Sequence, residues 1–156
     1  MIEYLPGGKK VAFDPLNEHY SNLFMNYRTP STQYIHDKAD VTNVTDGFDL
    51  AICHNVIDHT DDPAWWFDTL FTKLKLGGDF IFQVNLSRKG VPQPEEHARM
   101  HPSPFASAQI MSWLRSKSDS FEHSESEEMS TDGEYYFLAW GKKTHDVPIT
   151  YVNEVR

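Results

Sequence analysis

The residues with the clearest chemical potential follow an apolar run at 48–53. His54 and Asn55 come directly after the run, and Asp58 and His59 lie a little further on. A carboxylate beside an imidazole can orient the ring so that it accepts a proton from a substrate hydroxyl or amine. A structural hydrogen bond that fixes the turn is the alternative role for Asp58 and His59. If the run is a strand, His54 and Asn55 line a ligand cleft, because open α/β sheets hold ligands outside their strand ends.

Two further acids follow strand candidates nearer the start of the chain. Asp14 ends the run 9–14, and a carboxylate at a strand's carboxyl end can accept hydrogen bonds from both hydroxyls of a ribose. A cap for the following helix is the alternative role of Asp14. Asp37 follows the candidate strand 33–36, where a plain turn residue is equally consistent with the sequence.

A metal site is not expected from the histidine pattern. His97 and His101 are spaced so that they would share one face of a helix, as metal ligands can. Pro102 follows directly, and the sequence offers no clear third ligand. We therefore predict no metal site.

The elements that position these residues alternate between strands and helices. After the strand 48–53, Asp61-Asp62-Pro63 predicts the start of a helix over 64–74, Gly77-Gly78 its end, and 79–86 the next strand. A strand, helix, strand crossover builds a parallel sheet, so the predicted fold class is α/β. The other predicted elements are strands at 9–14 and 33–36, helices at 17–27 and 107–114, loops at 37–47 and 92–104, and a closing strand pair at 121–129 and 135–140.

Length and composition limit the class of protein. The 156 residues predict one domain, 1–156, and a formal net charge of -9 disfavours nucleic acid as a partner and favours a small molecule or a protein. The single cysteine, Cys53, lies in an apolar run and predicts a buried thiol in a reducing compartment. We find no leader and no membrane-spanning run, so we expect a cytoplasmic protein without a membrane partner.

The run FDLAICHNVIDHTDDPAWWFDTLFTKLKLGGDFIFQVNL at 48–86 resembles class I S-adenosylmethionine-dependent methyltransferases of the type 11 and type 23-like domains. Residues 11–15 are similar to the family's second strand. Glu96-His97 and HPSPFASAQIMSWL resemble the segment before its penultimate helix. The resemblance implies a Rossmann-like, mostly parallel sheet with a carboxyl-terminal antiparallel strand pair.

The resemblance also implies a function and a set of site residues. The activity would be methyl transfer from S-adenosylmethionine to a small-molecule or protein acceptor, with catalysis mainly by proximity and orientation. His54 and Asn55 would line the methyl-transfer cleft. The implied cofactor-binding residues are Asp14, Asp37, Lys38, His54 and Asn55, and the implied catalytic residues are His54, Asp58 and His59.

The chain departs from the family at its start, where it is truncated. The family has a strand and a Gly-x-Gly-x-Gly turn before the region that matches Met1, and only Pro6-Gly7-Gly8 stands here. Such glycines let the backbone approach the cofactor closely. We therefore expect weak binding of the free cofactor. The alternative function is a non-catalytic, methyltransferase-like regulatory or interaction protein, or a degenerate remnant; a nicotinamide dinucleotide binder is a more distant reading.

The absent strand would lie between 11–14 and 48–53, so the sheet needs a way to close. We expect direct pairing of those two strands first. The tail 148–156 is an extra strand or a docking segment, because 148–152 is rich in β-branched and aromatic residues. A homodimer formed through the tail is the second expectation. Trp65 and Trp66 exceed what one buried helix stripe can hold, so one of them is a candidate partner contact.

Overall fold

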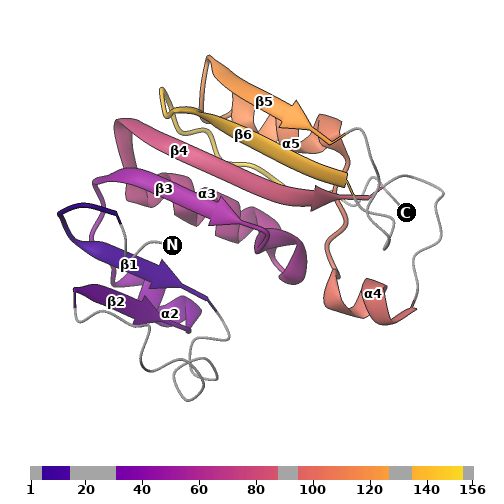
Figure 1. The fold of residues 1–156 in the computed structure, drawn as a ribbon, viewed down its shortest axis with the longest axis horizontal. Coiled ribbons are helices and arrows are strands. Elements are labelled where there is room, and N and C mark those ends of the chain that lie inside the picture. Colours follow the sequence, from indigo (N-terminus) through magenta and orange to yellow (C-terminus); the bar gives the residue numbers. More distant parts are fainter. Residues whose placement is uncertain (1–4, 15–30, 88–94, 127–134, 153–156) are drawn as a thin grey trace. The chain divides into compact units, whose positions relative to one another are not determined.

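The computed structural model of the chain describes residues 5–14, 31–87, 95–126 and 135–152, apart from the side chain of His97. The predicted helix at 17–27 lies outside these residues. The chain divides into two compact units, residues 1–45 and 46–156, which are described separately (Figure 1). None of the described helices is long and apolar enough to cross a membrane.

The described residues of the first unit, 5–14 and 31–45, form two parallel strands and a short helix. Strand β1 (Lys10–Phe13) pairs in parallel with β2 (Thr32–Ile35), as the apolar runs predict. Helix α2 (Lys38–Thr42) follows β2, and this corrects the loop predicted over 37–47. The helix forms because the carboxylate of Asp37 accepts the backbone N–H of Ala39 at 2.8 Å, which satisfies a donor at the helix start.

The second unit is built on a four-stranded mixed sheet of order β3-β4-β6-β5. Strands β3 and β4 are parallel, and β6 is antiparallel to both β4 and β5. The α/β class and the closing antiparallel pair are confirmed, although the turn between the last two strands lies outside the described residues. The strands are β3 (Phe48–His54), β4 (Leu74–Leu86), β5 (Phe121–Glu125) and β6 (Tyr135–Lys142).

Helix α3 (Pro63–Lys73) connects β3 to β4 and begins where the sequence predicts, with Asp62 as its cap. The helix ends at Lys73, one residue before the predicted end, but Gly77-Gly78 does not terminate it, because β4 begins directly after Lys73. Gly77 instead adopts a left-handed φ of 76° inside the strand, where its N–H donates to the carbonyl of Lys143 at 2.8 Å. The glycine pair thus shapes a strand irregularity and not a helix end. Trp65 and Trp66 are both half-buried on this helix.

Between β4 and β5, the residues that the structure describes form two helices. Helix α4 (Glu95–Met100) interrupts the loop predicted over 92–104, and α5 (Ser107–Arg115) confirms the helix predicted at 107–114. Because α4 ends at Met100, His101 lies beyond the helix. The shared face that a helix through 97–101 would give His97 and His101 therefore does not form.

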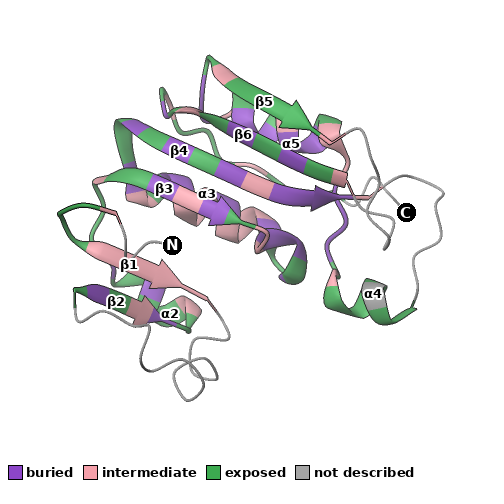
Figure 2. Ribbon diagram, in the orientation of Figure 1, coloured by how far each residue is buried: buried purple, intermediate pink, exposed green. Residues whose placement is uncertain are grey.

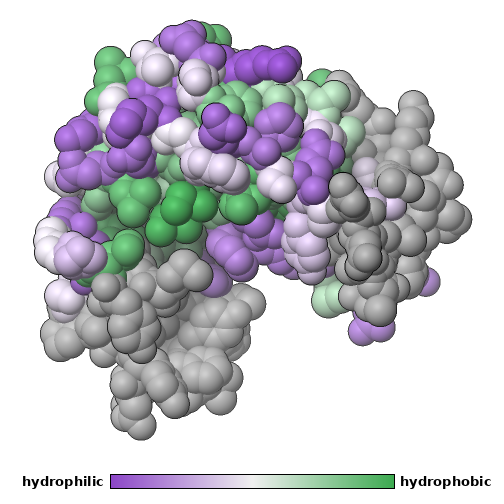
Figure 3. All heavy atoms as spheres, turned by 45° about the horizontal axis from the view of Figure 1, so that its top comes forward, coloured by the Kyte–Doolittle hydropathy of each residue, from purple (hydrophilic) through white to green (hydrophobic). Residues whose placement is uncertain are grey.

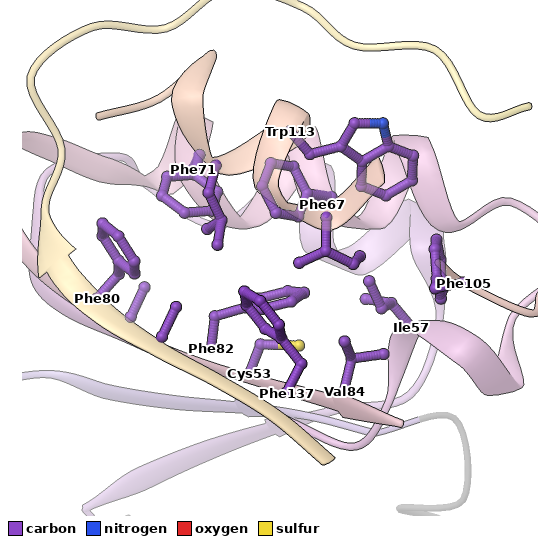
Figure 4. Close-up of a cluster of buried hydrophobic side chains, with 14 of the residues drawn as sticks. Cys53, Ile57, Phe67, Phe71, Phe80, Phe82, Val84, Phe105, Trp113 and Phe137 are labelled. Atoms are coloured by element: carbon purple, nitrogen blue, oxygen red, sulfur yellow. The ribbon is translucent and has the colours of Figure 1, made fainter. Parts of the chain in front are cut away.

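The core of the second unit lies between one face of the sheet and the helices α3 and α5 (Figures 1 and 2). Phe67 and Phe71 from α3 meet Phe82 and Phe137 from the strands, and Trp113 closes the cluster from α5 (Figure 4). Side chains of alternate residues face the opposite side of a sheet. Apolar side chains reach the surface (Figure 3), including Leu50, Ile81, Leu138 and Trp140, which the alternation places on that opposite face.

The tail does not form the strand that its composition predicts. Residues 148–152 are extended and pack on the helices: the carbonyl of Thr150 accepts the indole N–H of Trp113 at 3.3 Å. The amide of Gln109 donates to the carbonyl of Val152 at 2.6 Å. The tail that a dimer was expected to use is therefore bound within its own unit.

Direct pairing of residues 11–14 with 48–53 stays a prediction. Within the first unit a ladder joins β1 to β2, and within the second a ladder joins β3 to β4.

Candidate functional site

A strained turn follows β3 at the carboxyl end of the parallel pair. Asn55 has a left-handed φ of 50°, and its N–H donates to the carbonyl of Gln83 in β4 at 3.0 Å. Asparagine tolerates this conformation better than most residues. The side-chain oxygen Oδ1 of Asn55 is buried and has no hydrogen-bond partner among the described residues. A strained residue with an unsatisfied buried oxygen at a strand end is typical of a ligand site.

Asp58 lies in the short 3₁₀ helix η3 (Ile57–His59) and is 1% exposed. Its carboxylate oxygen Oδ2 is 2.8 Å from Nδ1 of His101, which follows α4. The backbone N–H of Ser103 donates to the carbonyl of Asp58 at 3.2 Å, and the Ser103 hydroxyl donates to the carbonyl of Thr60. These bonds hold the segment after α4 against η3, so a histidine distant in sequence reaches the buried acid.

His59 has a defined orientation beside this pair. Its Nδ1 lies 2.9 Å from the carbonyl of Met100, which can only accept, so Nδ1 carries the ring proton. The lone pair of the neutral ring is then at Nε2, which lies 3.4 Å from the amide nitrogen of Asn55 and 3.9 Å from Oδ2 of Asp58. The rings of His59 and His101 are 4.2 Å apart between centroids. The four residues form one cluster, here called the His59 cluster: Asn55, Asp58, His59 and His101.

The buried thiol near this cluster is not reactive. Burial raises the pKa of Cys53 to about 12, and the negative charge of Asp58 contributes to the rise. The thiolate is the nucleophilic form of cysteine, and it is scarcely populated at neutral pH. The position therefore serves packing, as the sequence predicts.

The structure divides the sequence-predicted site residues between the two units. Asn55, Asp58 and His59 lie together, whereas His54 is exposed at the end of β3 opposite Gln83. In the first unit, Asp14 is half-buried and directly follows β1. Its backbone N–H donates to the carbonyl of Ile35 at 3.1 Å. Asp37 caps α2 and Lys38 begins it. That Asp14, Asp37 and His54 line one cleft stays a prediction.

The sequence did not predict His101 as the partner of Asp58. Pro102 after it and the absent third ligand argued against a role, and only the fold brings the two side chains together. No local spacing signals a contact across 43 residues.

Comparison with known proteins gives matches in structure alone. No protein-family model and no curated protein matches the chain. The N-methyltransferase NodS from Bradyrhizobium japonicum WM9 superposes with a TM-score of 0.60 at 14% identity, over 92% of this chain and 79% of that one. Haemonchus contortus phosphoethanolamine N-methyltransferase 2 gives 0.62 at 10% identity, over 92% and 51%. TehB from Haemophilus influenzae gives 0.56 at 13% identity, over 88% and 51%.

These matches define the fold of the chain. It has the fold of class I S-adenosylmethionine-dependent methyltransferases, which the run at 48–86 predicted. NodS was also solved with S-adenosyl-L-homocysteine, and the Haemonchus enzyme with phosphomonomethylethanolamine and S-adenosylhomocysteine. The chain spans 79% of the length of NodS and 51% of the length of the Haemonchus enzyme.

Proposed function

We propose that the chain is a methyltransferase domain that uses S-adenosylmethionine to methylate a heteroatom of a small-molecule or protein acceptor. The observation that carries this proposal is the His59 cluster at the carboxyl end of β3. Open α/β sheets bind their ligands at this edge. The methyltransferase fold of the structural neighbours agrees with such a role.

The residues present fit parts of the cofactor. Asp14 supplies a carboxylate at the end of a parallel strand, which suits the two ribose hydroxyls. The buried oxygen of Asn55 suits a positively charged group, because it is an acceptor without a described donor. Gly7 and Gly8 have left-handed φ values of 66° and 72° with open space around their Cα atoms, so the backbone there is accessible to a ligand.

The His59 cluster would bind and activate the acceptor. When bound, S-adenosylmethionine supplies an electrophilic methyl group on its sulfonium. Nε2 of His59 presents the lone pair that can take the proton lost by the acceptor's hydroxyl or amine as its heteroatom bonds to the methyl carbon. Asp58 positions His101 by accepting from its ring, and the carbonyl of Met100 fixes the ring of His59 by accepting from its Nδ1. Most of the rate increase would come from holding the acceptor in line.

Titration with S-adenosylhomocysteine tests the proposal. We expect a dissociation constant weaker than about 1 μM for residues 1–156, because this sequence contains no Gly-x-Gly-x-Gly turn. Asp14→Ala should weaken binding by about tenfold or more, since hydrogen bonds to a charged acceptor contribute about 1.5–3 kcal/mol. Asp40→Ala is the matched control, because Asp40 is an exposed acid on α2. Isothermal titration calorimetry measures all three proteins.

Two outcomes would change the proposal. Equal affinity in Asp14→Ala and the wild type would remove Asp14 from the cofactor site. Complete absence of heat with both S-adenosylhomocysteine and S-adenosylmethionine would favour the non-catalytic, methyltransferase-like protein. Sub-micromolar binding would instead show that another segment of these residues binds the cofactor closely, with Pro6-Gly7-Gly8 as the first candidate.

A further inference from the structure

We propose that Asp58, His59 and His101 bind a divalent first-row transition-metal cation, with Zn²⁺ as the first candidate. One ligand atom from each residue lies within 4.8 Å of the other two. The role of the cation in activating a methyl acceptor rests on the proposed function. Binding of the cation itself is independent of methyl transfer.

The burial of Asp58 is the first argument. A carboxylate that is 1% exposed is costly to bury unless its charge is compensated. Its Oδ2 meets the ring of His101, but its Oδ1 is buried without a hydrogen-bond partner among the described residues. One hydrogen bond from an imidazole compensates the negative charge of this carboxylate only in part. A bound cation would compensate the rest.

The ligand spacing is the second argument. Zinc binds nitrogen and oxygen at about 2.0–2.2 Å, so neighbouring ligand atoms in a tetrahedral site lie about 3.3 Å apart. Oδ2 of Asp58 lies 2.8 Å from Nδ1 of His101 and 3.9 Å from Nε2 of His59. Shifts of about half an ångström bring both separations to the required value. For Nδ1 of His101 to bind, its proton must move to Nε2, and the ring stays neutral.

The orientation of His59 is the third argument. Metal-binding histidines usually donate their second ring N–H to a carbonyl or carboxylate, which fixes the tautomer. The carbonyl of Met100 accepts from Nδ1 of His59 in this way, so Nε2 presents its lone pair to the cluster. The amide nitrogen of Asn55 lies 3.4 Å from Nε2, so rotating that amide by half a turn, which exchanges the nitrogen with the unsatisfied Oδ1, frees the lone pair of His59 for the cation.

The ligand types select the metal. Two imidazoles and one carboxylate suit zinc and its first-row neighbours, whereas calcium and magnesium prefer sites built from oxygen. Three protein ligands leave a position for an acceptor heteroatom. A cation there makes the proton of the heteroatom more acidic, and water takes that proton. With the cation bound, the lone pair of His59 is a ligand, so the cation replaces the imidazole as the activating group.

Metal titration of the full chain tests the proposal. The protein is stripped with a chelator and titrated calorimetrically with Zn²⁺, and we expect a saturable one-to-one isotherm. Co²⁺ supplies a second readout, because it absorbs visible light with an intensity that reports tetrahedral coordination. Neither measurement requires a methyl acceptor, and titration with S-adenosylhomocysteine reports on the proposed function separately.

Single variants locate the site. Asp58→Asn, His59→Gln and His101→Gln should each weaken Zn²⁺ binding by more than the roughly 10–100-fold that loss of an outer hydrogen bond costs. His123→Gln is the matched control, because His123 is exposed on β5, and its affinity should equal that of the wild type. Absence of Zn²⁺ binding in the wild type overturns the proposal, as does equal binding by His59→Gln and His123→Gln. If Asp58→Asn does not fold, His59→Gln still decides, because its side chain is 39% exposed.

Discussion

Phe67→Ala should lower the free energy of unfolding of the second unit by about 3–5 kcal/mol, the range for removing a fully buried phenylalanine ring. Phe67 is 0% exposed, and its ring centroid lies 4.7–5.4 Å from those of Phe71, Phe82 and Trp113. These neighbours belong to α3, β4 and α5, so the ring joins both helices to the sheet (Figure 4). The cavity left by alanine lies among other rings, which cannot collapse into it without losing their own contacts.

Urea unfolding followed by far-ultraviolet circular dichroism measures this effect. Thr72→Ala is the matched control, because Thr72 is exposed on the same helix, and its change should stay within about 0.5 kcal/mol. Domains of this size are marginally stable, so Phe67→Ala can unfold outright, and Phe67→Leu then gives a measurable, smaller loss. Similar stability in Phe67→Ala and Thr72→Ala would contradict the role of this ring.

Phe67 is also an instance of what the sequence predicts well. The apolar spacing on α3 and the Asp62-Pro63 start were sufficient to place the helix and its buried stripe. The strand at 48–53 was equally clear, because a short apolar run between turn residues has few other interpretations. The helix and the strand depend mainly on residues close in sequence, so the local spacing of apolar residues is enough to predict them.

The errors have two causes: a helix cap that composition does not reveal, and contacts between residues distant in sequence. Helix α2 has the polar sequence KADVT, which predicts a loop until the cap by Asp37 is seen. The tail at 148–152 has strand composition, but its carbonyls bind side chains of α5. In the candidate site, the turn at Asn55, Asp58 and His59 was predictable, because polar residues follow a clear strand. His101 was not, because its position depends on how the segment after α4 packs.

Lys117 gives the second large effect, and it lies just after the end of α5. Its side chain is 1% exposed, with its ammonium 2.7 Å from a carboxylate oxygen of Asp68 and 2.5 Å from one of Asp146. The carbonyl of Val147 accepts a third bond at 2.9 Å. The buried ammonium thus joins α3, the end of α5 and the start of the tail.

Lys117→Ala should therefore destabilise the second unit by about 3 kcal/mol, the lower end of the range for breaking a buried ion pair. The lower end applies because Asp68 and Asp146 keep side-chain exposures of 26% and 32%, so water can partly solvate them. Lys142→Ala is the matched control. Its ammonium lies 2.6 Å from Asp79, but both side chains are exposed, and such pairs contribute about 0–1 kcal/mol.

The pH dependence of the same variant separates the ion pair from simple loss of packing. Burial alone would raise the pKa of Asp146, but hydrogen bonds and charge from Lys117 and Lys143 outweigh burial and lower the pKa below its ordinary value of 3.8. A carboxyl whose pKa falls on folding stabilises the protein above its unfolded pKa, and that stabilisation is lost as the pH falls through the lower folded value. The stability difference between wild type and Lys117→Ala should be constant near neutral pH and shrink below about pH 4. A difference that persists undiminished in acid would mean that Lys117 acts through its apolar stem and not through its charge.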